Sequence, residues 1–212
     1  MEPPQRPPRG SGHVPGHYYD EAPTVASRTG TVRLTLPDLT VDLTTDRGVF
    51  SADAIDAGTK YLLTDAPHPP GTGVLVDLGC GYGPIAISLA RRSPAATVWA
   101  VDVNERARDL CRANAAANGC DNVIVVAPAE VPEALVVDGI WSNPPIRVGK
   151  AALHEMLTSW LGRLAPTGSA WLVVQRHLGA DSLVRWLDDH GHPTRRLGSR
   201  QGYRILEASP RA

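Results

Sequence analysis

The sequence contains few cysteines and no long apolar segment. Its three cysteines (Cys80, Cys111 and Cys120) are an odd, widely spaced set without zinc-ligand spacing, so they predict neither a disulfide framework nor a metal site. No run approaches the roughly 20 apolar residues of a membrane span. The first residues are rich in Pro, Arg and Gly, unlike a signal peptide. We therefore expect a cytoplasmic protein with no metal and no membrane partner.

The sequence also lacks an excess of charge of either sign. It has 21 Lys and Arg against 22 Asp and Glu, a formal net charge of −1. Such a chain creates no global field that attracts nucleic acid, so any contact with nucleic acid must come from local patches. Four arginines near the C-terminus are one such patch, with a solvated strand edge as the alternative interpretation: Arg195, Arg196, Arg200 and Arg204.

The chain divides into an arm and one domain. Residues 1–30 carry prolines, glycines and polar residues without periodicity, which predicts a flexible arm. In residues 31–45 apolar residues alternate on both sides of a Pro-Asp turn, which predicts a β-hairpin. Within the domain, residues 31–212, the core occupies 74–212. There strand and helix patterns alternate, which indicates a parallel sheet with helices on both faces.

The individual elements can be placed from their patterns. Five strands and two closing strands are predicted at 74–78, 98–103, 123–127, 136–142, 170–174, 195–197 and 203–206. Helices are predicted at 57–63, after residue 83, and at 105–118, 151–164 and 182–190.

The most informative stretch is VLVDLGCGYG, residues 74–83. A buried strand runs into Gly79, Gly81 and Gly83, and a helix pattern follows at once. Glycine is needed where backbone lies against a nucleotide-like ligand. Dinucleotide sites use G-x-G-x-x-G, whereas the spacing here is G-x-G-x-G. Asp77 can accept a hydrogen bond from a cationic amine but would repel a pyrophosphate. A glycine-rich turn in some other doubly wound protein is the alternative.

A second acidic residue, Asp102, follows at the end of the second predicted strand. A carboxylate there can accept hydrogen bonds from both hydroxyls of a ribose. Dehydrogenases place an acid in the same way, so Asp102 indicates a nucleoside-containing ligand without naming it. Val103 offers an apolar surface to an adenine, and residues 128–130 would flank the adenine edge.

The sequence Asn143-Pro144-Pro145-Ile146 ends the fourth predicted strand. The Asn143 side-chain carbonyl and the Pro144 backbone carbonyl can each accept one N–H of a planar amino group. These bonds would aim the amine at an electrophilic carbon, and proline stiffens the loop that carries them. The fourth residue, Ile146, is not aromatic and cannot stack on a target ring. An ordinary turn after a strand is the alternative.

Basic and polar residues follow two of these strands. Arg147 and Lys150 can contact phosphates beside a flipped base, or they can belong to a solvated helix start. Gln175, Arg176 and His177 follow the fifth predicted strand and are candidates for contact with the substrate.

Four segments together resemble the small-domain methyltransferases, a class I family that uses S-adenosylmethionine. The segments are residues 48–63, 76–90, 98–119 and 141–150. That family includes the bacterial enzymes that methylate guanine N2 in 16S ribosomal RNA. Those enzymes carry a second N-terminal domain, and we expect this chain to be closer to the single-domain members.

The resemblance implies a Rossmann-like fold with a seven-stranded, mostly parallel sheet plus the N-terminal hairpin. It also implies S-adenosylmethionine as cofactor and RNA as partner, with Arg147 and Lys150 on the substrate. Catalytic roles fall on residues 143–146. The cofactor contacts implied are Asp77, Gly79, Cys80, Gly81, Asp102, Val103, Asn143 and Phe50.

Our first hypothesis is therefore an N-methyltransferase acting on an exocyclic amine, guanine N2 of 16S ribosomal RNA. A protein glutamine or an adenine is the alternative substrate, which Ile146 disfavours. A nicotinamide dehydrogenase fits Asp102 but not the glycine spacing. A non-catalytic cofactor-binding assembly factor is the alternative of another class, and the intact Asn143 argues against it.

Overall fold

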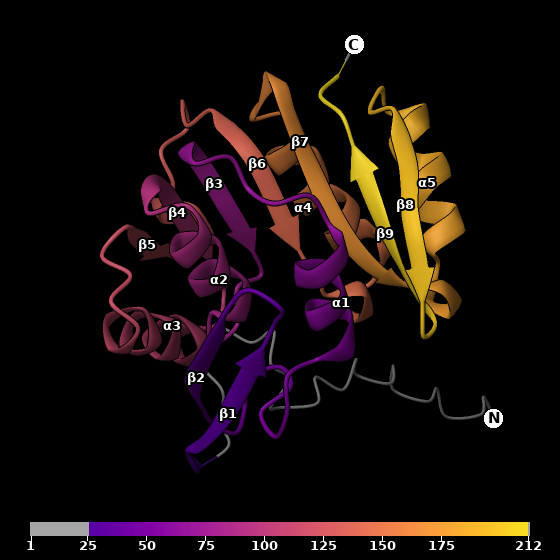
Figure 1. Ribbon diagram of the computed structural model, residues 1–212. Coiled ribbons are helices and arrows are strands. Elements are labelled where there is room, and N and C mark those ends of the chain that lie inside the picture. The colour runs from indigo at the N-terminus through magenta and orange to yellow at the C-terminus, as the bar shows by residue number, and fades with distance from the viewer. Residues whose placement is uncertain (1–25, 212) are drawn as a thin grey trace, which may run out of the picture.

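The chain folds into a two-stranded hairpin and a seven-stranded sheet with helices on both faces (Figure 1). The computed structural model describes residues 26–211, so most of the predicted arm lies outside the described residues. Strands β1 (Gly30–Thr35) and β2 (Thr40–Thr45) pair in antiparallel register and form the expected hairpin. Within the described residues, no helix is both long and apolar enough to cross a membrane.

The large sheet has the strand order β5-β4-β3-β6-β7-β9-β8. Strands β3 to β7 run parallel to one another, and β9 is antiparallel to both β7 and β8. The predicted fold class is confirmed. The strands are β3 (Thr72–Leu78), β4 (Ala95–Val101), β5 (Val123–Val126), β6 (Val137–Ser142), β7 (Leu164–Gln175), β8 (Thr194–Arg200) and β9 (Tyr203–Ala208).

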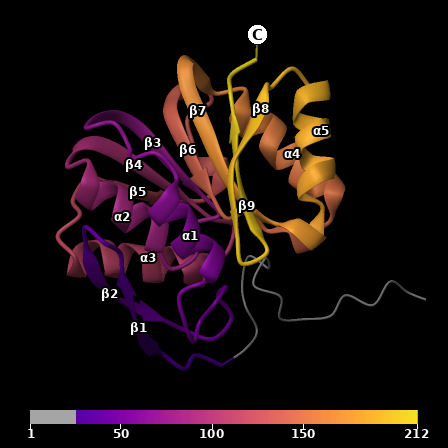
Figure 2. The same ribbon diagram turned by 45° about the vertical axis from the view of Figure 1, so that its right-hand side comes forward.

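Within the described residues, five α-helices cover the sheet. They are α1 (Ala57–Asp65), α2 (Pro84–Arg92), α3 (Glu105–Ala117), α4 (Lys150–Leu161) and α5 (Ala180–Asp189). Helices α1, α2 and α3 lie on the side of the sheet that also holds the hairpin, and α4 and α5 lie on the other side (Figure 2). The predicted helix at 151–164 was too long, because Leu164 continues the apolar spacing of α4 but pairs with Val137 as the start of β7.

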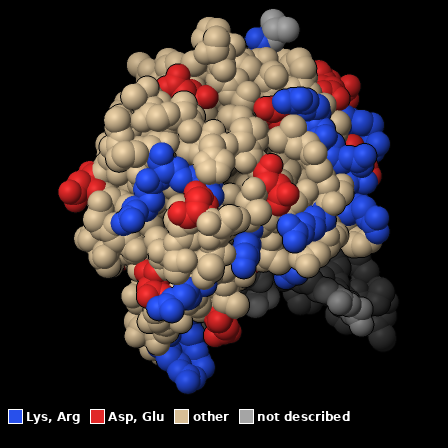
Figure 3. Space-filling view, in the orientation of Figure 1, with Lys and Arg blue, Asp and Glu red and all other residues tan. Residues whose placement is uncertain are grey.

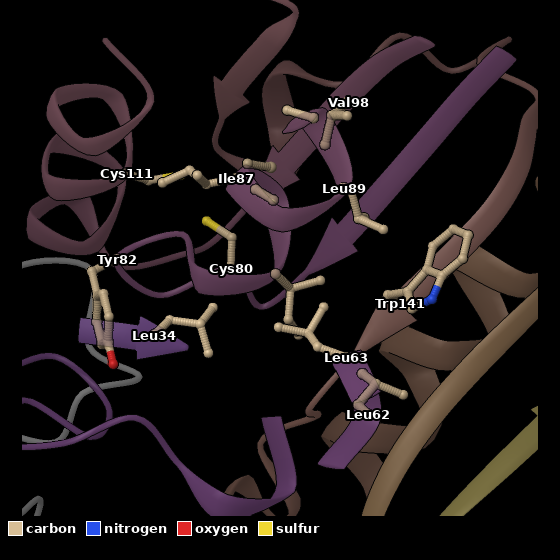
Figure 4. Close-up of a cluster of buried hydrophobic side chains, with 14 of the residues drawn as sticks. Leu34, Leu62, Leu63, Cys80, Tyr82, Ile87, Leu89, Val98, Cys111 and Trp141 are labelled. Atoms are coloured by element: carbon tan, nitrogen blue, oxygen red, sulfur yellow. The ribbon is translucent and has the colours of Figure 1, made fainter. Parts of the chain in front are cut away.

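Two hydrophobic cores form because successive strand residues point to opposite faces of the sheet. Leu75 and Trp141 belong to the core on the hairpin side, whereas their neighbours Val76 and Ile140 belong to the core under α4 and α5. Figure 4 shows how the first core joins distant segments. Its labelled side chains include Leu34 of β1, Leu62 and Leu63 of α1, Ile87 and Leu89 of α2, Val98 of β4 and Cys111 of α3.

A buried amide attaches the hairpin to the rest of the domain. The Oδ1 atom of Asn114 in α3 accepts from the Thr44 backbone N–H at 2.7 Å. Its Nδ2 donates to the Thr44 carbonyl at 2.8 Å and to the Tyr82 carbonyl at 2.9 Å. One side chain thus fixes β2, α3 and the turn before α2 relative to one another.

A buried carboxyl group holds the start of α2. Asp77 of β3 has no exposed surface, and its Oδ2 accepts from the Ala86 backbone N–H at 2.8 Å. Its Oδ1 is buried without a protein partner among the described residues. Burial raises the pKa of Asp77 from its ordinary 3.8 to about 8, since an apolar interior disfavours the charged form.

The Asn114 network predicts a large stability effect. Asn114→Ala leaves the Thr44 N–H and two carbonyl groups without partners, which should lower the free energy of unfolding by about 3 kcal/mol. Chemical denaturation measures the loss. Asp109→Ala on the exposed face of the same helix is the control and should cost less than about 0.5 kcal/mol. Equal losses in both variants would contradict the role of the buried amide.

The Asp77 carboxyl group predicts a dependence of stability on pH. Its folded pKa lies above its unfolded pKa, so its contribution is full at low pH and is lost as pH rises through about 8. Asp77→Asn keeps an acceptor for Ala86 and does not titrate. The stability of the variant relative to wild type should therefore increase between about pH 4 and pH 8 and stay constant above about pH 9. Urea unfolding at several pH values tests this, and a difference independent of pH would refute it.

Candidate active site

The candidate site lies at the carboxyl ends of β3, β4 and β6. Strand β4 pairs with one edge of β3 and β6 with the other, so the order of connections reverses at β3. Open α/β sheets bind their ligands outside the strand ends at such a reversal. A cavity of about 600 Å³ opens at this place. Most of the predicted site residues line it, namely Phe50, Gly79, Gly81, Asp102, Val103 and residues 143–147.

The glycine turn after β3 is held by backbone hydrogen bonds and leaves space beside it. The Gly79 and Cys80 N–H groups donate to the Val101 carbonyl at 2.8 and 3.0 Å. Gly79 and Gly81 have φ angles of +77° and +55°, which favour glycine. A Cβ on Gly81 would meet no atom within 4 Å, and one on Gly79 would meet only Pro145 Cδ at 3.9 Å. A ligand can therefore lie directly against this backbone.

Asp102 connects the glycine turn to the end of β4. The strand ends at Val101, so Asp102 lies just beyond it rather than within it as predicted. Its Oδ2 accepts from the Gly81 N–H at 2.8 Å and its Oδ1 from the Asn104 N–H at 2.9 Å. Each oxygen keeps a lone pair for one further donor. Burial raises the pKa of the Asp102 carboxyl group, and the backbone donors oppose that shift.

Apolar surface continues from Asp102 along the cavity wall. Val103 is 45% exposed and lines the cavity together with Pro128, the first residue of the short 3₁₀ helix η1 (Pro128–Glu130). Phe50, in the loop after the hairpin, is 38% exposed and lines the same cavity. Flat aromatic rings bind to such surfaces, so this wall suits a purine next to the Asp102 carboxylate.

The amide of Asn143 is bound to the first turn of α1. Its Nδ2 donates to Asp56 Oδ1 at 2.7 Å and to Thr59 Oγ1 at 3.0 Å. Asp56 is the N-cap of α1 and accepts from the Thr59 backbone N–H at 2.9 Å. Neither Asp56 nor Thr59 was identified from the sequence as a site residue. The segment 48–63, which contains both, was a signal that they lie near the site.

Pro144 and Ile146, which follow Asn143, contribute a polar and an apolar group to the cavity. The Pro144 carbonyl accepts from the Ile146 N–H at 2.8 Å, and its second lone pair remains available. Ile146 begins the 3₁₀ helix η2 (Ile146–Val148) and packs partly against the core under α4 and α5. Ile146 is therefore a piece of the apolar cavity wall and has no ring to stack on a target.

Two of the predicted cofactor residues lie below the turn rather than on the cavity wall. Asp77 is fully buried and does not line the cavity, and its expected contact with a cofactor stays a prediction. Cys80 lines only a small adjoining cavity of about 30 Å³. The neighbouring Cys111 thiol and burial raise the pKa of the Cys80 thiol, which keeps it protonated. Both residues support the turn from beneath.

Some of the predicted substrate-binding residues line the cavity and others lie outside it. Arg147 is exposed and lines the cavity, whereas Lys150 begins α4 on the surface outside it. Gln175 lines the cavity, but Arg176 and His177 of η3 (Arg176–Leu178) do not. Residues that the sequence did not identify complete the lining, among them Asp56, Glu155, Met156, Ser159, Trp160 and Tyr203.

The C-terminal arginines form a mixed rather than a basic surface. Figure 3 shows Lys and Arg side chains gathered near the edge strand β8, with acidic side chains among them. Arg195 pairs with Glu207, Arg204 with Asp181, and Arg200 with Asp65 at 3.7 Å. Three of the four cations are thus paired, which favours the solvated strand edge over a phosphate-binding patch.

Comparison with known proteins finds a matching family and several similar sequences. The family model of the methyltransferase small domain matches residues 40–207. YbxB of Bacillus subtilis, an uncharacterized protein, is 35% identical over 195 residues, which are 91% of this chain and 97% of that protein. The ribosomal RNA small subunit methyltransferase C of Pseudomonas aeruginosa is 34% identical over 76% of this chain and 48% of its own length.

Similarity in structure agrees with similarity in sequence. The 16S rRNA N2 G1207 methyltransferase of T. thermophilus, solved with AdoMet and guanosine, superimposes with a TM-score of 0.70 at 23% identity. The matched region covers 89% of this chain and 52% of that enzyme. The chain therefore spans about half the length of the named ribosomal RNA methyltransferases. The likeness shows the same fold. The family model matches well over half of this chain, and the predicted class of S-adenosylmethionine-dependent methyltransferases is confirmed. The chain belongs to the methyltransferase small domain family.

Proposed function

We propose that this protein transfers a methyl group from S-adenosylmethionine to an exocyclic amine, guanine N2 of small-subunit ribosomal RNA. One observation carries the proposal: the Asn143-Pro144-Pro145 turn borders the glycine turn in the cavity that Asp102 also lines. The two carbonyls that would accept the amine and the carboxylate that would bind the ribose therefore belong to residues that line one cavity. The ribosomal RNA substrates of relatives such as the Pseudomonas aeruginosa enzyme support the choice of RNA.

The residues of the cavity fit S-adenosylmethionine. Asp102 would accept the two ribose hydroxyls, Val103 and Pro128 would flank the adenine, and the backbone of Gly79 and Gly81 would lie against the rest. The volume of about 600 Å³ falls within the range of small-molecule sites. The cofactor supplies an electrophilic methyl group on a positively charged sulfur.

Asn143 and Pro144 supply what a poor amine nucleophile needs. The lone pair of an exocyclic amine is delocalised into its ring, so the nitrogen must be aimed and its pyramidal form favoured. The Asn143 Oδ1 and the Pro144 carbonyl would each accept one N–H of that amine, and both are rigidly held. Such prearranged hydrogen bonds lower the barrier by orientation. The amine proton is lost readily after the new C–N bond has formed.

The surroundings of the turn disfavour the alternative targets, an adenine and a protein glutamine. Ile146 packs against the core and offers no ring to stack on an adenine or on a glutamine amide. Arg147 lies at the cavity wall and Lys150 follows it on the surface, where both would contact phosphates beside a flipped nucleotide.

Transfer of radiolabelled methyl from S-adenosylmethionine tests the proposal directly. Total RNA, assembled small subunits and total protein are offered side by side. We expect label in RNA or subunits, recovered as N2-methylguanosine after digestion. Label in protein would replace guanine by a glutamine-type substrate. Tight cofactor binding with no transfer to any of the three would overturn the enzymatic assignment of this site.

Asn143→Ala should separate catalysis from cofactor binding. Loss of the carbonyl that aims the amine should lower kcat about 100-fold or more, while the Kd for S-adenosylmethionine stays close to the wild-type value. Single-turnover kinetics and calorimetry measure the two quantities. Asn122→Ala is the matched control, because that amide bonds to Ser93 and Ala96 at the other end of the sheet. A parallel rise in Kd would argue against the role of Asn143.

Asp102→Ala should act mainly on cofactor affinity. Two charge-assisted hydrogen bonds to ribose are lost, so the Kd for S-adenosylmethionine should rise about 10- to 100-fold. Asp109→Ala, an exposed carboxylate on α3, serves as the control. A wild-type Kd in the Asp102 variant would show that the ribose does not bind there.

A further inference from the structure

Asp56 lies behind the amide of Asn143, on the side of α1. The geometry assigns it a role beyond capping that helix: Asp56 is a positioning residue that fixes which atom of the Asn143 amide faces the target amine. This inference rests on the proposed function, because it explains how the Asn143 carbonyl becomes available as an acceptor.

Both hydrogens of the Asn143 amide are used on the α1 side. One goes to Asp56 Oδ1 at 2.7 Å and the other to Thr59 Oγ1 at 3.0 Å. Asp56 Oδ1 also accepts from the Thr59 N–H and therefore acts as an acceptor, so the Asn143 atom that faces it is the nitrogen. The carbonyl oxygen Oδ1 therefore points away from α1. Within the described residues, no protein donor binds this oxygen.

The orientation matters because an amide has two ends of similar shape and opposite function. Rotated by half a turn, Asn143 would present N–H groups to the N–H groups of the target amine, and no hydrogen bond would form. The partners at the start of α1 distinguish the two orientations, because Asp56 and Thr59 both accept from Nδ2.

Besides Asn143, two other segments of the chain bind Asp56 directly, α1 and β9. Its Oδ1 accepts from the Thr59 N–H at 2.9 Å as the helix cap. Its Oδ2 accepts from the Tyr203 hydroxyl at 3.4 Å, and that hydroxyl accepts from Gln175 Nε2 at 3.0 Å. A chain of hydrogen bonds thus runs from β7 through β9 and α1 to Asn143. Gln175, Tyr203, Asp56 and Asn143 all line the cavity.

Two substitutions separate the capping role from the positioning role. In Asp56→Ser, the hydroxyl can still cap α1 but is too short to reach Asn143 as well. Asp56→Asn keeps a carbonyl oxygen that can accept from both Thr59 and Asn143. Asp53→Ser is the control, since Asp53 is exposed and precedes Asp56 by only three residues.

The kinetic test compares kcat, the KM for RNA and the Kd for S-adenosylmethionine. We expect Asp56→Ser to lower kcat about 10- to 100-fold, with a melting temperature near wild type and only a small rise in Kd from the loss of one of the three cavity carboxylates. Asp56→Asn should recover most of that loss. Wild-type kcat in Asp56→Ser would overturn the inference. Equal loss in both variants, accompanied by equal loss of melting temperature, would reduce Asp56 to a structural cap and overturn it too.

A second readout keeps this inference separate from the proposed function. The side-chain amide signal of Asn143, assigned by NMR through Asn143→Ala, should show protons protected from exchange in the wild type. Asp56→Ser should remove that protection, whereas Asp53→Ser should not. If the wild type methylates no RNA, the proposed function fails, and this measurement still decides the orientation of the amide. Unprotected protons in the wild type would refute the positioning role.

Discussion

The site depends on the parallel pairing of β3 with β4 on one edge and with β6 on the other. The register places Asp77 opposite Ala100 of β4 and opposite Trp141 of β6, so the three strands end at nearly the same level. The glycine turn, Asp102 and Asn143 follow those three ends within a few residues. Because the pairing is hydrogen-bonded throughout and buried on both faces, residues distant in sequence converge with little freedom.

Several side chains serve the fold and the candidate site at once. Asp102 binds the Gly81 N–H and caps the turn before α3, yet it retains lone pairs toward the cavity. Asp56 caps α1 and binds Asn143 through the same oxygen. Such sharing couples local folding to the geometry of the site: the turn of α1 must be formed before the amide is oriented. The residues that stabilise the fold therefore also hold the site in place.

The sequence predicted the parts that are local in the chain. The strand, the glycine turn and the Asn-Pro-Pro turn could be identified because their residue types are dictated by backbone geometry. The burial of Asp77 was not predicted, because spacing does not say that its carboxyl group accepts from the Ala86 N–H beneath the glycine turn. The pairing of Asp56 with Asn143 was missed because 87 residues separate the two, and only the folded chain brings them together. The end of α4 was missed because Leu164 satisfies both a helical and a strand pattern.

The charges of the cavity are arranged for two ligands of opposite sign. Its lining contains three carboxylates, Asp56, Asp102 and Glu155, and one cation, Arg147. An acidic interior would attract S-adenosylmethionine, whose sulfur is positively charged, and the basic residues at the rim would contact the phosphates of the proposed RNA. Methyl transfer removes the charge from sulfur, so the attraction of the carboxylates for the spent cofactor is weaker than for the substrate form. The same electrostatics that favours binding before transfer therefore favours release after it.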